Sequence, residues 1–372
     1  METHPIKLYW SRSACVKDWT CPRARWYGYE YAGRGLSPAT IDLNLFIGIC
    51  VHDAIAALVA GVDIDVLCAA ANQQMHAALD PANGNFDELE FAKEQACLVE
   101  GMIRGYHRHV WPIFREDYPT IVASEREFVY EHDGLSFLSK PDLLVRDAIG
   151  DLHYIEFKTA AYVKEQWINQ WQTAVQLHSS VKAVEATLGE KVMSVIVQAF
   201  LKGGEYYGKQ GSIFCYGYAR AAEPPFTKAV LAYEYKAGLR KFPVWELPGG
   251  VKEWVAKMPT NVLSQQFPQV PPIFPNDDLV NAFFRQRATR EHQIKGASAR
   301  INGNELTDAE KQTQLDDYFP QVFEKCNPGF GFGCEFRTLC HGFHPDPLEA
   351  GFSLRTSHHA LEEAQLLEQE KQ

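Results

Sequence analysis

An aspartate, a glutamate and a lysine in the middle of the chain have the types and spacing of a metal-dependent hydrolytic site. Asp142 lies in one β-rich run, and Glu156 and Lys158 lie in the next. The short loop between the runs contains Gly150, which predicts a three-residue hairpin turn. Such a hairpin would place Asp142 opposite Glu156, with Lys158 on the same face because side chains alternate along a strand.

The predicted register depends on Asp147 pairing with Asp151 across the turn. Two opposed carboxylates repel each other and destabilise a hairpin, whereas a divalent cation between them makes the arrangement favourable. Oxygen ligands of this kind suit Mg2+ or Mn2+, which polarises a phosphodiester and lowers the pKa of a bound water that a nearby lysine can orient. The alternative is that these residues are solvent-facing polar groups of a half-buried sheet.

The hairpin belongs to a series of expected elements that changes from helix to strand and back to helix. A helix is expected to open at Ser37-Pro38 and continue through Leu58. Further helix is expected over 64–115, 164–188 (stopping at Leu188-Gly189) and 274–325, and strands over 121–130, 135–147, 152–159, 191–201 and 212–219. This order predicts an α/β or α+β core with helical additions at both ends.

Composition and charge restrict the class of protein. The chain has 372 residues, of which 46% are hydrophobic and 22% charged, which is typical of a folded globular protein. A net charge of −11 argues against a broad, nonspecific nucleic-acid binder but allows a local basic groove. Candidates for such a groove are Arg285, Arg287, Arg290, Lys295 and Arg300, or Lys236, Arg240 and Lys241. The longest apolar run, 43–61, is interrupted by polar residues and does not fit a bilayer span. The first residues lack the layout of a signal peptide, so we expect a cytoplasmic protein.

Four cysteines have the distribution of metal or cluster ligands. Cys326, Cys334 and Cys340 lie within fifteen residues, and Cys21 lies near the other end of the chain in Cys-Pro-Arg-Ala-Arg-Trp-Tyr. In a reducing compartment, clustered cysteines indicate metal binding, and thiolates hold either zinc or iron–sulfur. Zinc ribbons favour paired C-x2–4-C ligands, which this spacing lacks. Four other cysteines are expected to be buried apolar thiols, namely Cys50, Cys68, Cys97 and Cys215.

Pro141-Asp142 followed by Glu156-x-Lys158 resembles the PD-(D/E)XK nuclease superfamily, and the surroundings look RecB-like. The resemblance implies a restriction-endonuclease-like core with a central mixed sheet flanked by helices. It also implies a metal-dependent cut in DNA, single-stranded or at an end. Glu125 or Glu127 would be the preceding acidic residue, and His52 in its helix would be a metal ligand. A lone histidine on an apolar helix is otherwise more often a satisfied core residue.

The same resemblance assigns roles within the site. His52, Asp142 and Glu156 would hold Mg2+ or Mn2+ with help from the Phe157 carbonyl, while Lys158 and Gln176 would position the water and the scissile phosphate. Gln176 departs from the family pattern, because the family tyrosine four residues later is replaced by Ser180. Gln172, one turn earlier on the expected helix, could share the role.

The cysteine order is similar to that of iron–sulfur RecB-like nucleases, including CRISPR-associated exonucleases and AddB nuclease domains. This resemblance implies a [4Fe-4S] cluster held by Cys21, Cys326, Cys334 and Cys340, although the seven-residue gap after Cys326 is longer than usual. Zn2+ at the same cysteines is the alternative. Residues 1–345 would form one nuclease domain with its core at about 37–220. Residues 346–372 would form a solvated C-terminal tail that carries His358 and His359 and ends in a loose helix. A noncatalytic DNA-binding or scaffold subunit of a larger complex remains the competing hypothesis.

Overall fold

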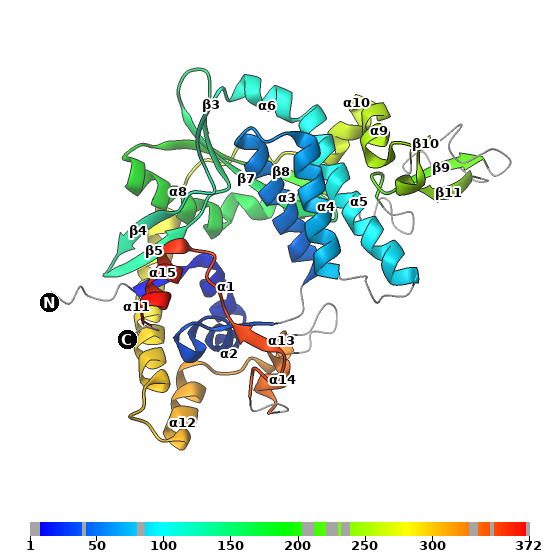
Figure 1. Cartoon of the computed structure of the whole chain (residues 1–372). Coiled ribbons are helices and arrows are strands. Elements are labelled where there is room, and N and C mark those ends of the chain that lie inside the picture. The colour runs from blue at the N-terminus through cyan, green and yellow to red at the C-terminus, as the bar shows by residue number, and fades with distance from the viewer. Residues whose placement is uncertain are drawn as a thin grey trace.

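A four-stranded mixed sheet lies at the centre of the computed structural model (Figure 1). The structure describes residues 8–38, 42–79, 86–202, 212–220, 230–231, 239–326, 334–342 and 346–369. The strand order is β3-β6-β7-β8. The bounds are β3 (Thr120–Ser124), β6 (Leu143–Arg146), β7 (Leu152–Ala160) and β8 (Val192–Leu201). The pairs β3/β6 and β6/β7 are antiparallel and β7/β8 is parallel, so the predicted mixed α/β architecture is confirmed.

The β6/β7 hairpin has the predicted register. Leu143 pairs with Ile155, so the preceding residue, Asp142, comes opposite Glu156. At the turn, the Asp147 amide donates to the Asp151 carbonyl over 3.1 Å. Gly150 has φ +96°, a left-handed conformation that glycine adopts without a steric penalty. The turn therefore fixes which side chains meet at the far end of the hairpin.

Smaller sheets join segments from both ends of the chain to the core. β1 (Leu8–Ser11) pairs in parallel with β5 (Leu135–Ser139), which pairs antiparallel with β4 (Phe128–His132). β12 (Phe352–Leu354) pairs antiparallel with β2 (Leu36–Pro38). A peripheral sheet consists of β9 (Tyr216–Arg220), β10 (Val230–Leu231) and β11 (Leu239–Pro243).

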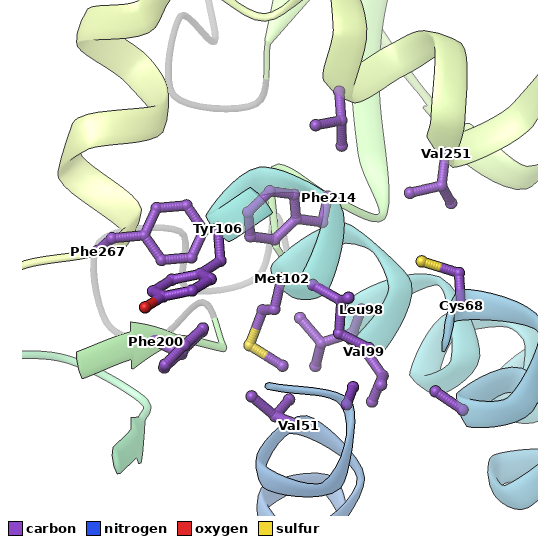
Figure 2. Close-up of a cluster of buried hydrophobic side chains, with 14 of the residues drawn as sticks. Val51, Cys68, Leu98, Val99, Met102, Tyr106, Phe200, Phe214, Val251 and Phe267 are labelled. Atoms are coloured by element: carbon purple, nitrogen blue, oxygen red, sulfur yellow. The ribbon is translucent and has the colours of Figure 1, made fainter. Parts of the chain in front are cut away.

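Helices from the first half of the chain pack on one face of the central sheet. They are α3 (Leu43–Val59), α4 (Ile64–Leu79), α5 (Phe86–His109) and α6 (Trp111–Asp117), with α9 (Gly250–Lys257), α10 (Thr260–Leu263), η7 (Val244–Glu246) and η8 (Ser264–Gln266) packed beside them. Figure 2 shows the resulting apolar cluster around α5. A Cβ at Gly101 would lie 2.4 Å from Phe214, so glycine is needed for this close approach.

The helix that carries His52 begins later than expected. α3 starts at Leu43, and the Asp42 side chain caps it by accepting from the amides of Asn44 and Leu45. Ser37-Pro38 instead belongs to β2. The expected cap at Ser37 was wrong because a distant strand, β12, pairs with this segment.

A second set of helices covers the other face of the sheet. It contains α7 (Glu165–Asn169), the 3-10 helix η4 (Gln170–Thr173), α8 (Val175–Leu188) and α11 (Asp277–Asn302). Helix α12 (Asp308–Tyr318) packs against α11 in a separate apolar cluster. The continuous helix expected over 164–188 is broken at Ala174, whose backbone is extended. Its predicted stop is confirmed, since Gly189 caps α8 at φ +70°.

Both ends of the chain form a third region beside the sheet. It includes α1 (Arg12–Thr20), α2 (Pro22–Arg25), η1 (Trp26–Glu30), η2 (Tyr31–Gly33), α13 (Phe323–Cys326), α14 (Arg337–Cys340) and α15 (Ala360–Gln369). The amides of Ala360 and Leu361 donate to the Glu127 carboxylate over 2.6 and 3.2 Å, which anchors α15. The helix expected at the end of the tail is therefore confirmed, whereas the expectation that it is loose was wrong. None of the helices described is both long and apolar enough to cross a membrane.

Candidate functional site

Three potential metal ligands meet beside the open end of the β6/β7 hairpin. One ligand atom from each of His52, Glu125 and Asp142 lies within 4.8 Å of the others. His52 comes from α3, Glu125 follows β3, and Asp142 directly precedes β6. The His52 Nδ1 lies 3.3 Å from Asp142 Oδ1. Burial would lower the pKa of His52, but the negative charge of Asp142 outweighs burial and raises it.

Of the two candidate glutamates before the hairpin, Glu125 lies beside His52 and Asp142, whereas Glu127 does not. Glu125 has φ +52°, a conformation that costs a non-glycine residue about 1–3 kcal/mol. Its amide donates to the Asp142 carbonyl over 3.1 Å, and its carboxylate pairs with Lys140 at 2.9 Å. Burial and the neighbouring Asp142 charge raise the pKa of Glu125. The sequence left the two glutamates as alternatives, and Glu127 instead caps α15.

Glu156 lies beside the three-residue group rather than within it. It is 2% exposed on β7, and its Oε1 accepts from Gln176 Nε2 over 2.6 Å. The Lys158 ammonium and the Tyr154 hydroxyl also contact its carboxylate. Burial raises the pKa of Glu156, and the charge of Asp142 raises it further against the opposing effect of Lys158.

Lys158 is a half-buried ammonium group that contacts Glu156 and lies in the field of Asp142. Burial would lower its pKa, but the charges of Glu156 and Asp142 outweigh burial and raise it. The lysine is therefore protonated and acts as a hydrogen-bond donor. The Phe157 amide donates to Asp142 Oδ2 over 2.6 Å. The expected use of the Phe157 carbonyl as a metal ligand stays a prediction.

Gln172, Gln176 and Ser180, the polar residues considered on the helix after the hairpin, have different surroundings in the structure. Gln176 is in the first turn of α8 and bonds Glu156. Gln172 is exposed in η4, outside α8, so the expectation that it shares the helical face of Gln176 was wrong. Ser180 accepts a hydrogen bond of 2.8 Å from Ser139. The Tyr154 hydroxyl contacts Glu156, and the sequence analysis missed this residue although strand alternation puts it on the same face as Glu156 and Lys158.

A cavity of about 210 Å³ adjoins the hairpin. Asp142, Glu156, Lys158 and Gln176 line part of it. The remaining lining includes residues from the two ends of the chain, among them Ser11, Arg12, Arg355, His358 and His359. Nothing in the sequence connects these residues with the hairpin. His358 is exposed, as expected for a solvated tail, whereas His359 is half-buried. His359 Nδ1 lies 3.2 Å from Glu127 Oε1.

The four candidate cluster cysteines come together from the two ends of the chain. The charges of Cys21, Cys326 and Cys334 all act on Cys340, whose pKa burial and these neighbours raise to about 12. The Cys334 amide donates to the Cys326 carbonyl over 3.2 Å. All nine cysteines are free thiols. The glycine-rich segment 327–333 lies outside the described residues.

The expected basic groove along α11 is contradicted for three of its five cations, whereas Arg285 and Arg300 are exposed. Arg287 is 5% exposed and pairs with Asp18 and Glu291, at 2.8 and 2.7 Å. Arg290 also pairs with Asp18, and Lys295 pairs with Glu30. These cations compensate buried carboxylates, so they are not available to a nucleic acid. Lys236, in the second candidate stretch, lies outside the described residues.

Comparisons with known proteins add no family assignment. The chain matches none of the family models, and no curated protein matches it. The RecB-like resemblance thus depends on the short motifs around Asp142, Glu156 and Lys158 and on the cysteine order.

Proposed function

We propose that the protein is a Mg2+- or Mn2+-dependent deoxyribonuclease with a restriction-endonuclease-like core, acting as an exonuclease on single-stranded DNA or DNA ends. The observation that carries the proposal is the meeting of His52, Glu125 and Asp142 beside Glu156 and Lys158. A histidine and two carboxylates are suitable ligands for Mn2+, and carboxylates for Mg2+. Glu125 joins His52 and Asp142 as a proposed ligand on the basis of this grouping.

The residue types at the hairpin fit a divalent ion. Glu125 and Glu156 both have raised pKa values, caused first by burial, so their surroundings do not fully compensate a negative charge. A bound cation would stabilise both ionised carboxylates. His52, Glu125 and Asp142 would hold the ion, and a shift of the Glu156 carboxylate toward them would add the predicted ligand. The ion would supply Lewis-acid polarisation of the phosphate and a more acidic bound water.

The chain's own polar groups have distinct roles in this proposal. The Lys158 ammonium donates a hydrogen bond to Glu156 and is suited to orient the attacking water or a phosphate oxygen. Gln176 donates through its side-chain amide to Glu156 Oε1, the same oxygen that Lys158 contacts. In hydrolysis, the water oxygen bonds to phosphorus, the phosphorus–oxygen bond to the leaving nucleotide breaks, and that oxygen takes a proton.

The proposed activity is tested by degradation of labelled single- and double-stranded DNA in the presence of Mn2+. Lys158→Ala is expected to abolish degradation, while Lys182→Ala, which removes a lysine of an outer helix, is expected to retain it. Equal degradation by Lys158→Ala and the unaltered chain would identify a contaminating nuclease. Binding of DNA without cleavage by any form would favour the noncatalytic DNA-binding or scaffold subunit.

We further propose that Cys21, Cys326, Cys334 and Cys340 hold a [4Fe-4S] cluster. The support is four thiols that interact with one another at the junction of the chain ends. Sulfurs on one tetrahedral zinc ion would lie about 3.8 Å apart. In the described ranges, the one group of ligand atoms within 4.8 Å of each other is that of His52, Glu125 and Asp142. The sequence spacing of the cysteines lacks the paired C-x2–4-C ligands of zinc ribbons, and it therefore favours the cluster over a single zinc ion.

The cluster is tested by the iron and sulfide content and the visible absorption of the purified protein. Cys340→Ala is expected to lose iron, the absorption band and stability together. The control is Cys68→Ala, because Cys68 belongs to the apolar core and not to the four-cysteine group. Zinc in place of iron would establish the alternative, and full iron content in Cys340→Ala would contradict the proposed ligand.

A further inference from the structure

Part of the cavity beside the hairpin is lined by basic side chains that have no role in the proposed metal centre. Arg12 belongs to α1, and Arg355 and His358 belong to the segment between β12 and α15. All three line the same cavity as Asp142 and Lys158. Its volume of about 210 Å³ is below the roughly 300–1,000 Å³ of pockets for drug-sized ligands. The cavity therefore suits a small ligand group or one unit of a longer chain.

Arg12 is a partly buried cation without a fixed protein partner. Within the part of the chain that is described, it has neither a hydrogen bond nor an ion pair. Burial lowers the pKa of Arg12, and the charge of Glu156 only partly offsets this effect. Partial removal of a guanidinium from water is unfavourable unless an anion accepts its hydrogen bonds. The planar guanidinium group matches phosphate oxygens with two parallel hydrogen bonds.

The residues from the C-terminal segment are held rigidly against this part of the cavity. The Arg355 Nε donates to the Arg34 carbonyl over 3.0 Å, and its guanidinium lies 4.7 Å from the centre of the Tyr29 ring. The β12/β2 pairing holds the segment on one side of Arg355 and His358, and the Glu127 cap of α15 holds it on the other. A ligand therefore meets the Arg355 guanidinium in a position that is already fixed, which reduces the entropy lost on binding.

We infer that Arg12, Arg355 and His358 form a subsite for a phosphate group of the substrate strand, next to the phosphate that is cut. The inference rests on the proposed nuclease function and gives it a second phosphate contact supplied by the chain ends. The shared chemistry is that of a phosphate, either an internal diester or a terminal monoester. Arg12 contributes most, because Arg355 already pairs with Glu362 at 3.3 Å.

The subsite is tested by binding of fluorescent single-stranded oligonucleotides to the noncleaving Lys158→Ala chain, by fluorescence anisotropy. Three otherwise identical strands carry a 5′-phosphate, a 3′-phosphate or no terminal phosphate. Arg12→Gln in this background is expected to raise Kd about 10-fold, as loss of a charged hydrogen bond predicts. Arg12→Lys is expected to recover part of the affinity, and His358→Gln to lose less than Arg12→Gln. Arg115→Gln, the control, removes an exposed arginine from α6 and is expected to change nothing.

The three strands separate the two sources of phosphate. Weakening limited to one phosphorylated end assigns the subsite to a terminal monoester, and weakening with all three assigns it to an internal diester. Equal Kd values for Arg12→Gln and its Lys158→Ala parent on every strand would overturn the subsite. Thermal unfolding of Arg12→Gln is expected to match the parent, because Arg12 has no protein partner to lose.

Failure of the subsite and failure of the nuclease proposal give different results. Cleavage by the unaltered chain with no effect of Arg12→Gln on Kd removes the subsite alone. Strand binding that depends on Arg12, without cleavage by the unaltered chain, supports the subsite and removes the nuclease. In an active enzyme, most of the loss in Arg12→Gln is expected in KM, because this residue is proposed to bind a phosphate that does not react.

Discussion

Two buried groups of charged residues in this molecule have opposite electrostatic character. The ion-pair cluster, made of Asp18, Arg25, Glu30, Arg287, Arg290, Glu291 and Lys295, joins α1, α2 and η1 to α11. The hairpin centre consists of His52, Glu125, Asp142, Glu156 and Lys158. In the first, burial would raise the pKa of Glu30, but Lys295 and Arg25 lower it to about 2. In the second, the pKa values of Glu125 and Glu156 are raised.

This difference separates a structural use of buried charge from a functional one. The ion-pair cluster compensates its carboxylates with arginine hydrogen bonds, so removal of one member leaves the others uncompensated. In the hairpin centre, burial would raise the pKa of Asp142, but His52 and Lys158 lower it. The charges of Glu125 and Glu156 are not fully compensated. Such partly compensated carboxylates are typical of a site that binds a cation. The comparison can be tested by perturbing each group and measuring both stability and activity.

The largest expected effect is the loss of activity when the hairpin centre loses a ligand. Asp142→Asn is expected to reduce Mn2+-dependent DNA cleavage by more than the roughly 100-fold caused by losing an outer partner of a metal ligand. Its free energy of unfolding is expected to stay high enough for the variant to remain folded, so that the loss of activity is not caused by unfolding. Single-turnover cleavage and urea denaturation measure the two quantities. A variant that unfolds but retains cleavage per folded molecule would contradict the comparison.

The reverse result is expected for the ion-pair cluster. Glu291→Ala leaves Arg25 and Arg287 buried without their shared partner, and is expected to lower the free energy of unfolding by about 3–5 kcal/mol. Cleavage per folded molecule is expected to stay unchanged. Glu253→Ala is the control, because it breaks an exposed pair with Lys257 and is expected to cost below about 1 kcal/mol. Equal destabilisation by both variants would contradict the prediction that the buried cluster contributes more to stability than an exposed ion pair.

The stability of the cluster is also expected to depend on pH. Glu30 has a folded-state pKa of about 2, against an ordinary value of 4.5. Its ionised form is therefore favoured by folding, and its contribution of about 3 kcal/mol is present above pH 4.5 and lost as the pH falls toward 2. Urea unfolding between pH 6 and pH 3 measures this slope. Glu30→Gln is expected to have a flatter dependence, and an identical slope would contradict the assignment.

The smallest expected effect on stability is at Glu125. Glu125→Gln removes a carboxylate whose raised pKa means that folding disfavours its charge, so stability is expected to stay within about 1 kcal/mol at neutral pH. Mn2+ affinity, measured by calorimetry, is expected to fall about 10-fold. Glu127→Gln separates the two neighbouring glutamates, because it is expected to weaken the α15 cap and leave Mn2+ affinity unchanged. Unchanged Mn2+ affinity in Glu125→Gln would exclude that residue as a ligand.

The hairpin could be predicted from the sequence because its determinants are local. Strand alternation and the short loop with Gly150 together set the register that brings Asp142 opposite Glu156. The charge run around Arg287 was misinterpreted because its partners lie far away, as with the contact between Arg25 and Glu291, 266 residues apart. Periodicity within a short window carries no information about such pairs. The same limit hid the place of Arg12 in the cavity.

The arrangement of the cavity also has a consequence for biosynthesis. A ribosome releases the hairpin residues long before the segment that carries Arg355 and His358, and domains generally fold from the N-terminal side as they emerge. The carboxylates can therefore assemble on a nascent chain whose cavity still lacks part of its lining. In the proposed nuclease, full affinity for a DNA strand is then expected only after residue 358 has been translated and β12 has paired with β2.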